Sequence, residues 1–180
     1  MKRSEMRRWG VGVMVLVILA FPMVAVGETV RTDLSGYEET PVLSTPGNGQ
    51  FKARISSKDE TINYELSFQD TETGVTQAHI HFGAPAIAGP IVIFLCSNLG
   101  NGPAGTQACP AAGGTITGTL TPANVGAGAA AQGIAAGEFD EVVRAIRAGA
   151  MYVNVHTVGR PGGEVRGQLD RRNHDHHDDD

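Results

Sequence analysis

The chain has 180 residues and a formal net charge of −5, and it is 41% hydrophobic but only 6% aromatic. An acidic balance, with no concentrated basic segment after residue 27, argues against nucleic acid as a partner, because phosphate binding requires a basic surface. The length suits one compact domain, whose core we expect to consist mainly of Val, Ile, Leu and Ala.

Residues 1–27 have the composition of a signal peptide. Four basic residues within positions 2–8 precede the apolar run 11–25, which is shorter than the about 20 residues of a membrane-spanning helix. Small residues at Ala25 and Gly27 predict cleavage before Glu28; an uncleaved membrane anchor is the alternative. We therefore expect an extracytoplasmic protein, secreted or periplasmic, that is free of the membrane after cleavage.

Downstream of Val30 the sequence alternates between apolar and polar residues, as half-buried antiparallel strands do. Segments 51–55 and 62–68 show this alternation, and the polar segment 56–60 between them predicts a hairpin turn. Further strands are expected within 89–97, 113–120, 151–158 and 162–169. Seven or eight short strands separated by Gly-rich turns predict an all-β sandwich or barrel.

Cys96 and Cys109 are the two cysteines of the chain. In an oxidising compartment an even pair predicts a disulfide, here closing a loop rich in Gly, Pro and Asn. Such a bridge stabilises the fold by about 3 kcal/mol in the chain-entropy model. A metal or redox role is disfavoured, because the spacing is not that of a C-x-x-C motif.

One segment, 138–148, has helical rather than strand periodicity. Its apolar residues follow the i, i+3, i+4, i+7 spacing of an amphipathic helix, and they are Phe139, Val142, Val143 and Ile146. Acidic residues begin the segment, Arg144 and Arg147 lie near its end, and Gly149 is placed to stop it. The two arginines therefore have a structural explanation, which we favour over a binding role.

Residues 171–180 form a polar tail with three histidines and four aspartates. Nothing in this segment can be buried, so disorder is expected. We favour a solvated acidic tail over capture of divalent metal by its histidines, because charge runs of this kind are usually interaction-poor.

Segments 78–96 and 147–169 strongly resemble the CHRD domain, a family named after the extracellular protein chordin and widespread in exported bacterial proteins. The opening segment 34–55 matches as well, with an acidic residue before Pro-Val and a Gly-rich turn into a strand. The resemblance extends over 28–170. It implies an antiparallel Greek-key-type sandwich, immunoglobulin-like or superoxide dismutase-like, with one short helix inserted near 138–148.

The stretch QAHIHFG places His79 and His81 two residues apart in a predicted strand. Residues i and i+2 of a strand point to the same face, so both imidazoles lie opposite Ile80 and Phe82. If these apolar residues face the core, both histidines lie on the outer face of the sandwich.

A third histidine has the same expected orientation. In 151–157, Val153 and Val155 alternate with Tyr152, Asn154 and His156, which places His156 outside. His79, His81 and His156 can converge if their strands are neighbours, and three imidazoles suit Cu or Zn with one position left open. The alternative is that the histidines only hydrogen-bond to backbone carbonyls.

The three histidines also resemble part of the copper site of copper/zinc superoxide dismutase. That family has an H-x-H strand followed closely by a Gly, and a later strand that ends in Val-His. The resemblance implies that His79, His81 and His156 match three of four copper ligands. Because the fourth histidine and a zinc-ligand loop are missing from the core segment, it does not imply dismutase activity.

Arg166 is loosely similar to the anion-guiding arginine of the dismutase family. Its alternative role is a surface ion pair with Glu164. No nucleophilic Ser or Cys with a base is recognisable, and Asp33, Glu38 and Glu39 cluster only in sequence. These observations favour a protein without catalytic activity.

Two functional hypotheses follow. The favoured one is an exported, non-catalytic binding or structural module that contacts an extracytoplasmic protein or matrix partner. The alternative is a copper- or zinc-binding protein, with possible redox activity, whose ligands are His79, His81 and His156.

Overall fold

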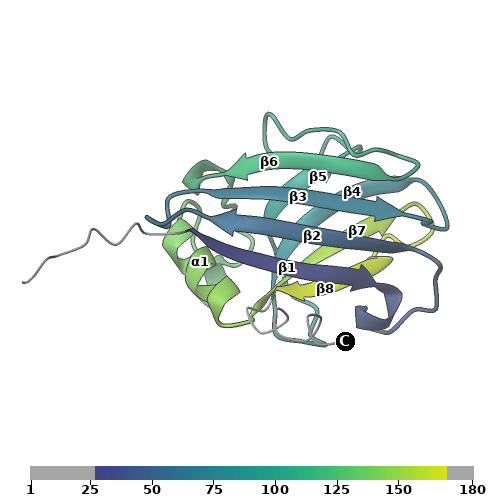
Figure 1. Ribbon diagram of the computed structural model, residues 1–180, viewed down its shortest axis with the longest axis horizontal. Helices are drawn as coiled ribbons and strands as arrows, with labels where there is room; N and C mark the ends of the chain where they lie inside the picture. Colours follow the sequence, from purple (N-terminus) through teal and green to yellow (C-terminus); the bar gives the residue numbers. More distant parts are fainter. Residues whose placement is uncertain (1–26, 170–180) are drawn as a thin grey trace, which may run out of the picture.

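The computed structural model describes residues 27–169 (Figure 1). In chain order its strands and helix are β1 (Glu28–Ser35), β2 (Asn48–Ile55), β3 (Ile62–Gln69), β4 (Val75–Phe82), β5 (Ile91–Ser97), β6 (Gly114–Leu120), α1 (Phe139–Arg147), β7 (Met151–Thr157) and β8 (Val165–Leu169). Short 3-10 turns occur at Gly36–Glu38, Pro122–Asn124 and Ala130–Gln132. The predicted signal peptide, apart from Gly27, and the predicted tail at 171–180 lie outside the described residues.

The strands form one antiparallel sheet in the order β5-β4-β7-β8-β1-β2-β3-β6. β8 and β1 share only the Ser35–Arg166 pair, so the sheet folds there into two halves that face each other. Figure 1 shows β1, β2, β3 and β6 in front of the other half. The chain crosses between the halves after β3, β5 and β6, as in Greek-key sandwiches. The all-β prediction is confirmed.

The predicted alternation is present in β2 and β3. Phe51, Ala53 and Ile55 of β2 are buried, whereas Lys52 and Arg54 between them are exposed. In β3 the buried residues are Ile62, Tyr64, Leu66 and Phe68. These side chains face the other half of the sheet, and their removal from water is the main force that holds the halves together.

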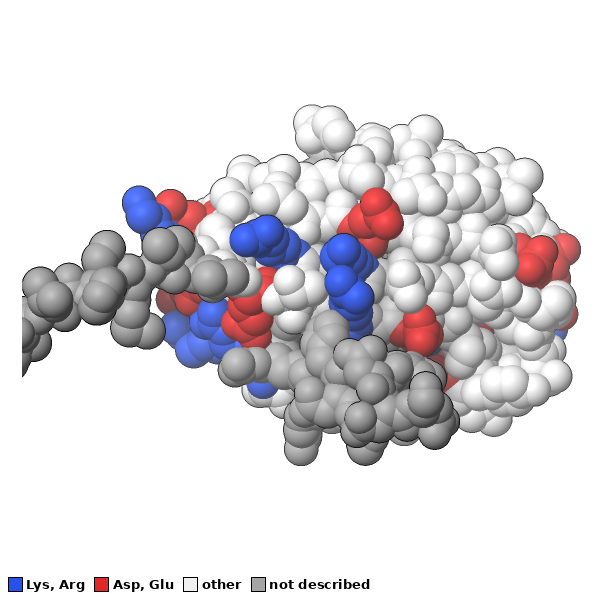
Figure 2. Space-filling model, viewed as in Figure 1, with Lys and Arg blue, Asp and Glu red and all other residues white. Residues whose placement is uncertain are grey.

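The outer face of the front half carries charges of both signs. Lys52 lies directly between Arg31 on β1 and Glu65 on β3. Figure 2 shows blue and red side chains next to one another on this face, so the basic residues do not form one large patch.

β7 is buried on both faces. Met151, Val153 and Val155 belong to the apolar core, as the alternation predicts. Asn154 and His156 point to the outer face, yet only 4% and 5% of their surface is exposed. Loops cover this part of the outer face, so the outward orientation predicted from the sequence does not bring solvent exposure.

The inserted helix α1 spans Phe139–Arg147, one residue shorter at each end than the predicted 138–148. The helix buries its apolar side chains Phe139, Val142, Val143 and Ile146. Gly149, one residue after the C-cap, has a φ of +67°, which confirms the predicted left-handed stop. No helix among residues 27–169 is long and apolar enough to span a membrane.

Both arginines of α1 have the structural roles expected from the sequence. Arg144 pairs with Asp140 and Glu141 on the helix itself. Arg147 donates hydrogen bonds to Glu28, at 2.8 Å, and to both carboxylate oxygens of Asp59, each at 2.8 Å. Arg147 therefore fastens α1 to the start of β1 and to the turn between β2 and β3.

Cys96 and Cys109 form the predicted disulfide, with a Cα–Cα distance of 5.1 Å. The bridge joins the end of β5 to the segment that leads into β6. Within the closed loop the Asn98 side chain donates to the carbonyls of Val75 and Cys109. The loop is thus fixed both covalently and by hydrogen bonds to β4.

We expect the double variant Cys96→Ser/Cys109→Ser to unfold at a lower urea concentration than the wild type, with a loss of about 3 kcal/mol. The reason is that the open chain gains conformational entropy in the unfolded state. Equilibrium urea denaturation measures the difference. Reductant should destabilise the wild type by a similar amount and leave the variant unchanged; equal stability of the two oxidised proteins would contradict the prediction.

Candidate metal centre

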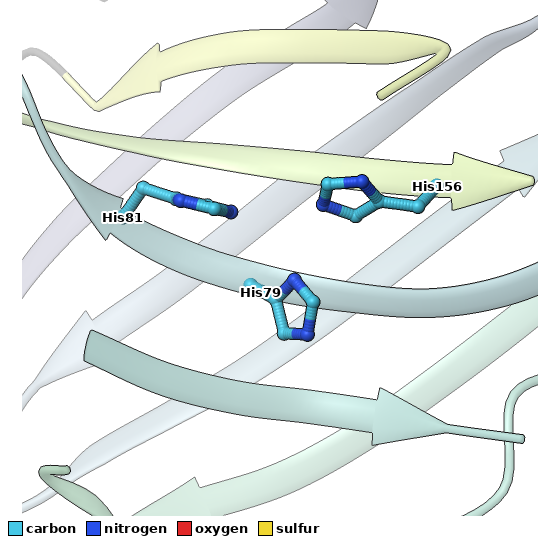
Figure 3. A group of neighbouring side chains, drawn as sticks. All are labelled: His79, His81 and His156. Carbon is cyan, nitrogen blue, oxygen red and sulfur yellow. The ribbon is translucent and has the colours of Figure 1, made fainter. Parts of the chain in front are cut away.

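Two neighbouring strands carry the candidate ligands. β4 and β7 pair in a register that sets His79 opposite Asn154, His81 opposite Tyr152, and Gln77 opposite His156. Directly opposed residues of an antiparallel pair share one face of the sheet. The register therefore brings His79, His81 and His156 to the same outer face, where Figure 3 shows their rings turned toward one another.

The three imidazoles form a compact, buried group. Their ring centres are 5.4 Å apart for His79 and His81, 4.9 Å for His79 and His156, and 5.8 Å for His81 and His156. One ring nitrogen from each lies within 4.8 Å of the other two. The exposed fractions of His79, His81 and His156 are 0%, 6% and 5%. The condition for convergence, that β4 and β7 are neighbours, is thus met, and the three rings form one group.

Backbone carbonyls fix the tautomers of two of these rings. The Nδ1 of His81 donates to the Gly89 carbonyl at 2.9 Å, and the Nδ1 of His156 donates to the Pro161 carbonyl at 3.0 Å. Because a carbonyl can only accept, Nδ1 carries the proton in both rings and Nε2 carries a free lone pair. The predicted backbone hydrogen bonds exist, but they use only one nitrogen of each ring.

Four buried ring nitrogens of this group have no hydrogen-bond partner: Nδ1 and Nε2 of His79, Nε2 of His81 and Nε2 of His156. An unpaired buried polar atom costs about 1–3 kcal/mol, and such atoms are rare in folded proteins. Their clustering at one place therefore needs a chemical explanation.

Burial keeps the three rings neutral. It lowers the pKa of His79 to about 3, with a further contribution from the charges that His156 and His81 would carry. Burial also lowers the pKa of His81 to about 4, against the opposing hydrogen bond to Gly89. The pKa of His156 is lowered by burial as well. At neutral pH the lone pairs are therefore not blocked by protons.

Aromatic rings surround the group. Phe94, on β5, packs against His79 in a T-shaped arrangement, with ring centres 4.4 Å apart and an interplanar angle of 82°. Tyr152 stacks on His81 at 4.8 Å and 7°. These contacts orient the rings of His79 and His81 within the group.

Arg166, 2% exposed, lies behind Tyr152, with its guanidinium carbon 3.5 Å from the centre of that ring. It donates to the carbonyls of Ala84 and Ile87 and to the side chains of Thr40 and Gln168. The guanidinium therefore holds the covering loop 83–90, which carries the Gly89 carbonyl that His81 contacts.

The predicted surface ion pair of Arg166 with Glu164 is wrong. Glu164 is itself buried, and its carboxylate accepts from Thr45, from the Glu72 backbone and from Thr157. The loose likeness of Arg166 to an anion-guiding arginine also finds no support, because its donors face loop carbonyls rather than solvent.

Glu39 is a buried acid near the candidate site that sequence reasoning left without a role. Asn154 donates to it at 3.4 Å, and Gly163 packs so closely that a Cβ there would lie 2.6 Å from its Oε1. Burial raises the pKa of Glu39 to about 7, against opposing contributions from Thr40, Arg166 and Asn154. Its sequence signal is its position before Pro-Val in segment 34–55, which resembles the opening of the CHRD domain.

We expect the apo protein to lose stability between pH 7 and pH 4.5 partly through His79. As the pH falls below 6.5 the unfolded chain binds a proton at this histidine, whereas the folded chain does not until about pH 3. Relative to His79→Leu, the wild type should lose about 2–3 kcal/mol over this interval. Urea denaturation at both pH values, with chelator present, measures the difference.

Glu39 acts in the opposite direction in this experiment. Its raised pKa means that the folded chain holds the proton more tightly, so its contribution to stability declines as the pH rises from 4.5 to 7. The residue is present in both proteins, so its effect cancels in the comparison. Parallel stability curves for the wild type and His79→Leu would contradict the prediction.

Comparison with known proteins identifies the family. The model of the CHRD domain matches residues 30–169, which include all eight strands except the first two residues of β1. No curated protein and no solved structure matches the chain. The matched segment contains His79, His81, His156 and both cysteines. The chain therefore belongs to the CHRD domain family.

Proposed function

We propose that the protein binds one transition-metal ion, copper or zinc, through His79, His81 and His156. The observation that carries this proposal is the set of four unpartnered, buried ring nitrogens in a group whose ligand atoms lie within 4.8 Å of one another. Each neutral ring has one lone pair, so the group offers three, and a metal ion would use all three and remove the cost of leaving them unpaired.

The three ligand nitrogens lie slightly too far apart for one ion, so they must move closer together when it binds. At metal–nitrogen bonds of about 2.0–2.1 Å, two ligand nitrogens can be at most about 4.2 Å apart, and about 3.4 Å in a tetrahedral site. The longest separation of 4.8 Å therefore has to shrink by about 0.6–1.4 Å. The proposal therefore requires small rotations of the imidazole rings when the ion binds.

The carbonyls of Gly89 and Pro161 support this role. Metal-bound histidines usually donate their second ring nitrogen to a carbonyl or carboxylate, which orients the ring and fixes its tautomer. His81 and His156 have this arrangement already. Among residues 27–169 no Asp, Glu or Cys joins the group, so a fourth position would be left for water or an exchangeable ligand.

We also propose that the protein acts outside the cytoplasm. The Cys96–Cys109 disulfide fits an oxidising compartment, and residues 1–27 read as a signal peptide. A protein or matrix partner is a second, compatible role. Its support is the exposure of Tyr37, Val42 and Ile87, 71%, 68% and 56%, on two loops that Arg166 joins through Thr40 and Ile87.

We expect the protein to bind one equivalent of Cu or Zn at pH 7.5, measured by elemental analysis after dialysis. The tail histidines should first be changed to Ala at positions 174, 176 and 177, so that they do not contribute. In this background, His79→Ala, His81→Ala and His156→Ala should each weaken binding by more than about 100-fold, because each removes a ligand.

Gln77→Ala is the matched control for this experiment. Gln77 lies on the same strand and face as His79 and His81 but is not a member of the ligand group. This variant should retain one equivalent of metal. Absence of stoichiometric metal in the parent protein, or equal uptake by His79→Ala, would overturn the proposed function.

A further inference from the structure

We propose that the three-histidine site selects monovalent copper, Cu(I), over divalent ions, and that Arg166 is the residue that determines this selectivity. The inference rests on the proposed metal site and names the ion that it takes. It depends on three features: the charge of the ligands, their burial, and a fixed positive charge beside them.

The ligands contribute no negative charge. All three are neutral imidazoles, and among the described residues neither a carboxylate nor a thiolate completes the group. A bound ion therefore keeps its full charge inside the protein. Imidazole binds copper and zinc alike, so the donor type alone does not choose between them.

Burial makes this charge costly. The three histidines are at most 6% exposed, and Phe94 and Tyr152 pack against two of them. The Born cost of moving an ion from water into such surroundings grows with the square of its charge, so it is about four times larger for a divalent than for a monovalent ion. An exposed three-histidine site would not discriminate in this way.

Arg166 adds a permanent positive charge. The stack of Arg166, Tyr152 and His81 has separations of 3.5 and 4.8 Å, so its guanidinium carbon lies no more than about 8 Å from the His81 ring centre. Arginine stays protonated in proteins. None of the ion pairs found among residues 27–169 includes Arg166. Its charge therefore acts on the site and repels a divalent ion more than a monovalent one.

Of the two buried acids among residues 27–169, Glu39 and Glu164, Glu39 is the one whose charge acts on Arg166. It contacts Asn154 rather than the guanidinium, and it offsets the charge of Arg166 only when it is ionised. Glu38, the next acid, is exposed. Removal of the Glu39 charge should therefore strengthen the preference for Cu(I), whereas removal of the Arg166 charge should weaken it.

Competition experiments on the protein with Ala at 174, 176 and 177 test the inference. Cu(I) affinity is measured without oxygen against a chromogenic Cu(I) chelator, with ascorbate as reductant because it leaves the disulfide intact. Cu(II) and Zn(II) affinities are measured against chelators of divalent ions at the same pH. We expect the dissociation constant for Cu(I) to be at least 100-fold lower than either of the others.

Three variants test whether the effect comes from the charge. Arg166→Gln should reduce the ratio of Cu(I) to Cu(II) affinity by about tenfold to thirtyfold, as expected for one unit charge at about 8 Å in a protein interior. Arg166→Lys, which keeps the charge, should retain most of the preference. Glu39→Gln should move the ratio in the opposite direction from Arg166→Gln.

The outcomes separate the two proposals. If no metal binds stoichiometrically, the proposed function is wrong and the inference is overturned with it. If metal binds but the wild type holds Zn(II) or Cu(II) as tightly as Cu(I), only the selectivity is overturned. An unchanged ratio in folded Arg166→Gln removes the role of Arg166; should this variant not fold, the wild-type comparison and Glu39→Gln decide.

Discussion

The hydrogen bonds from Nδ1 of His81 and His156 to the carbonyls of Gly89 and Pro161 organise this side of the molecule. They join a sheet face to the loops that cover it, and they determine which nitrogen of each ring keeps its lone pair. Burial under these loops then holds the rings neutral. The nitrogens that can bind a ligand are therefore determined by the loop carbonyls as well as by the histidines themselves.

The local geometry explains why particular residues occupy the covering loop. A Cβ at Gly89 would lie 1.8 Å from the Phe82 carbonyl, so only glycine fits where the chain passes this close to the end of β4. The Gly89 backbone also accepts from His81 and donates to the Tyr152 hydroxyl. One glycine thus positions a candidate ligand and the aromatic ring stacked on it.

The strands and the orientation of the histidines could be predicted from the sequence because both depend on a period of two. Phe51, Ala53 and Ile55 show the pattern plainly. The disulfide followed from cysteine number and compartment, and α1 from its own periodicity. These are local properties, and each needs only a short stretch of sequence to be recognised.

The remaining features depend on contacts between distant segments. The meeting of His156 with His79 requires β4 and β7 to be neighbours, which the topology decides. The outer face of β7 is buried because the 83–90 and 158–163 loops fold over it. The alternation of apolar and polar residues along β7 does not predict this burial. The surface position expected for Arg166 and Glu164 was wrong for the same reason: isolated charges in sequence normally indicate surface, whereas here both side chains are buried.

The fastening of the covering loop also bears on how quickly a ligand exchanges. Arg166 donates to the carbonyls of Ala84 and Ile87, and Gln168 donates to that of Gly83, so an ion that enters past this loop would have to wait for these hydrogen bonds to open. The lifetime of a bound ion would then be limited by loop opening rather than by the strength of its bonds to nitrogen. Under the proposed function, such a protein would release its ion slowly and would serve for storage rather than for rapid buffering.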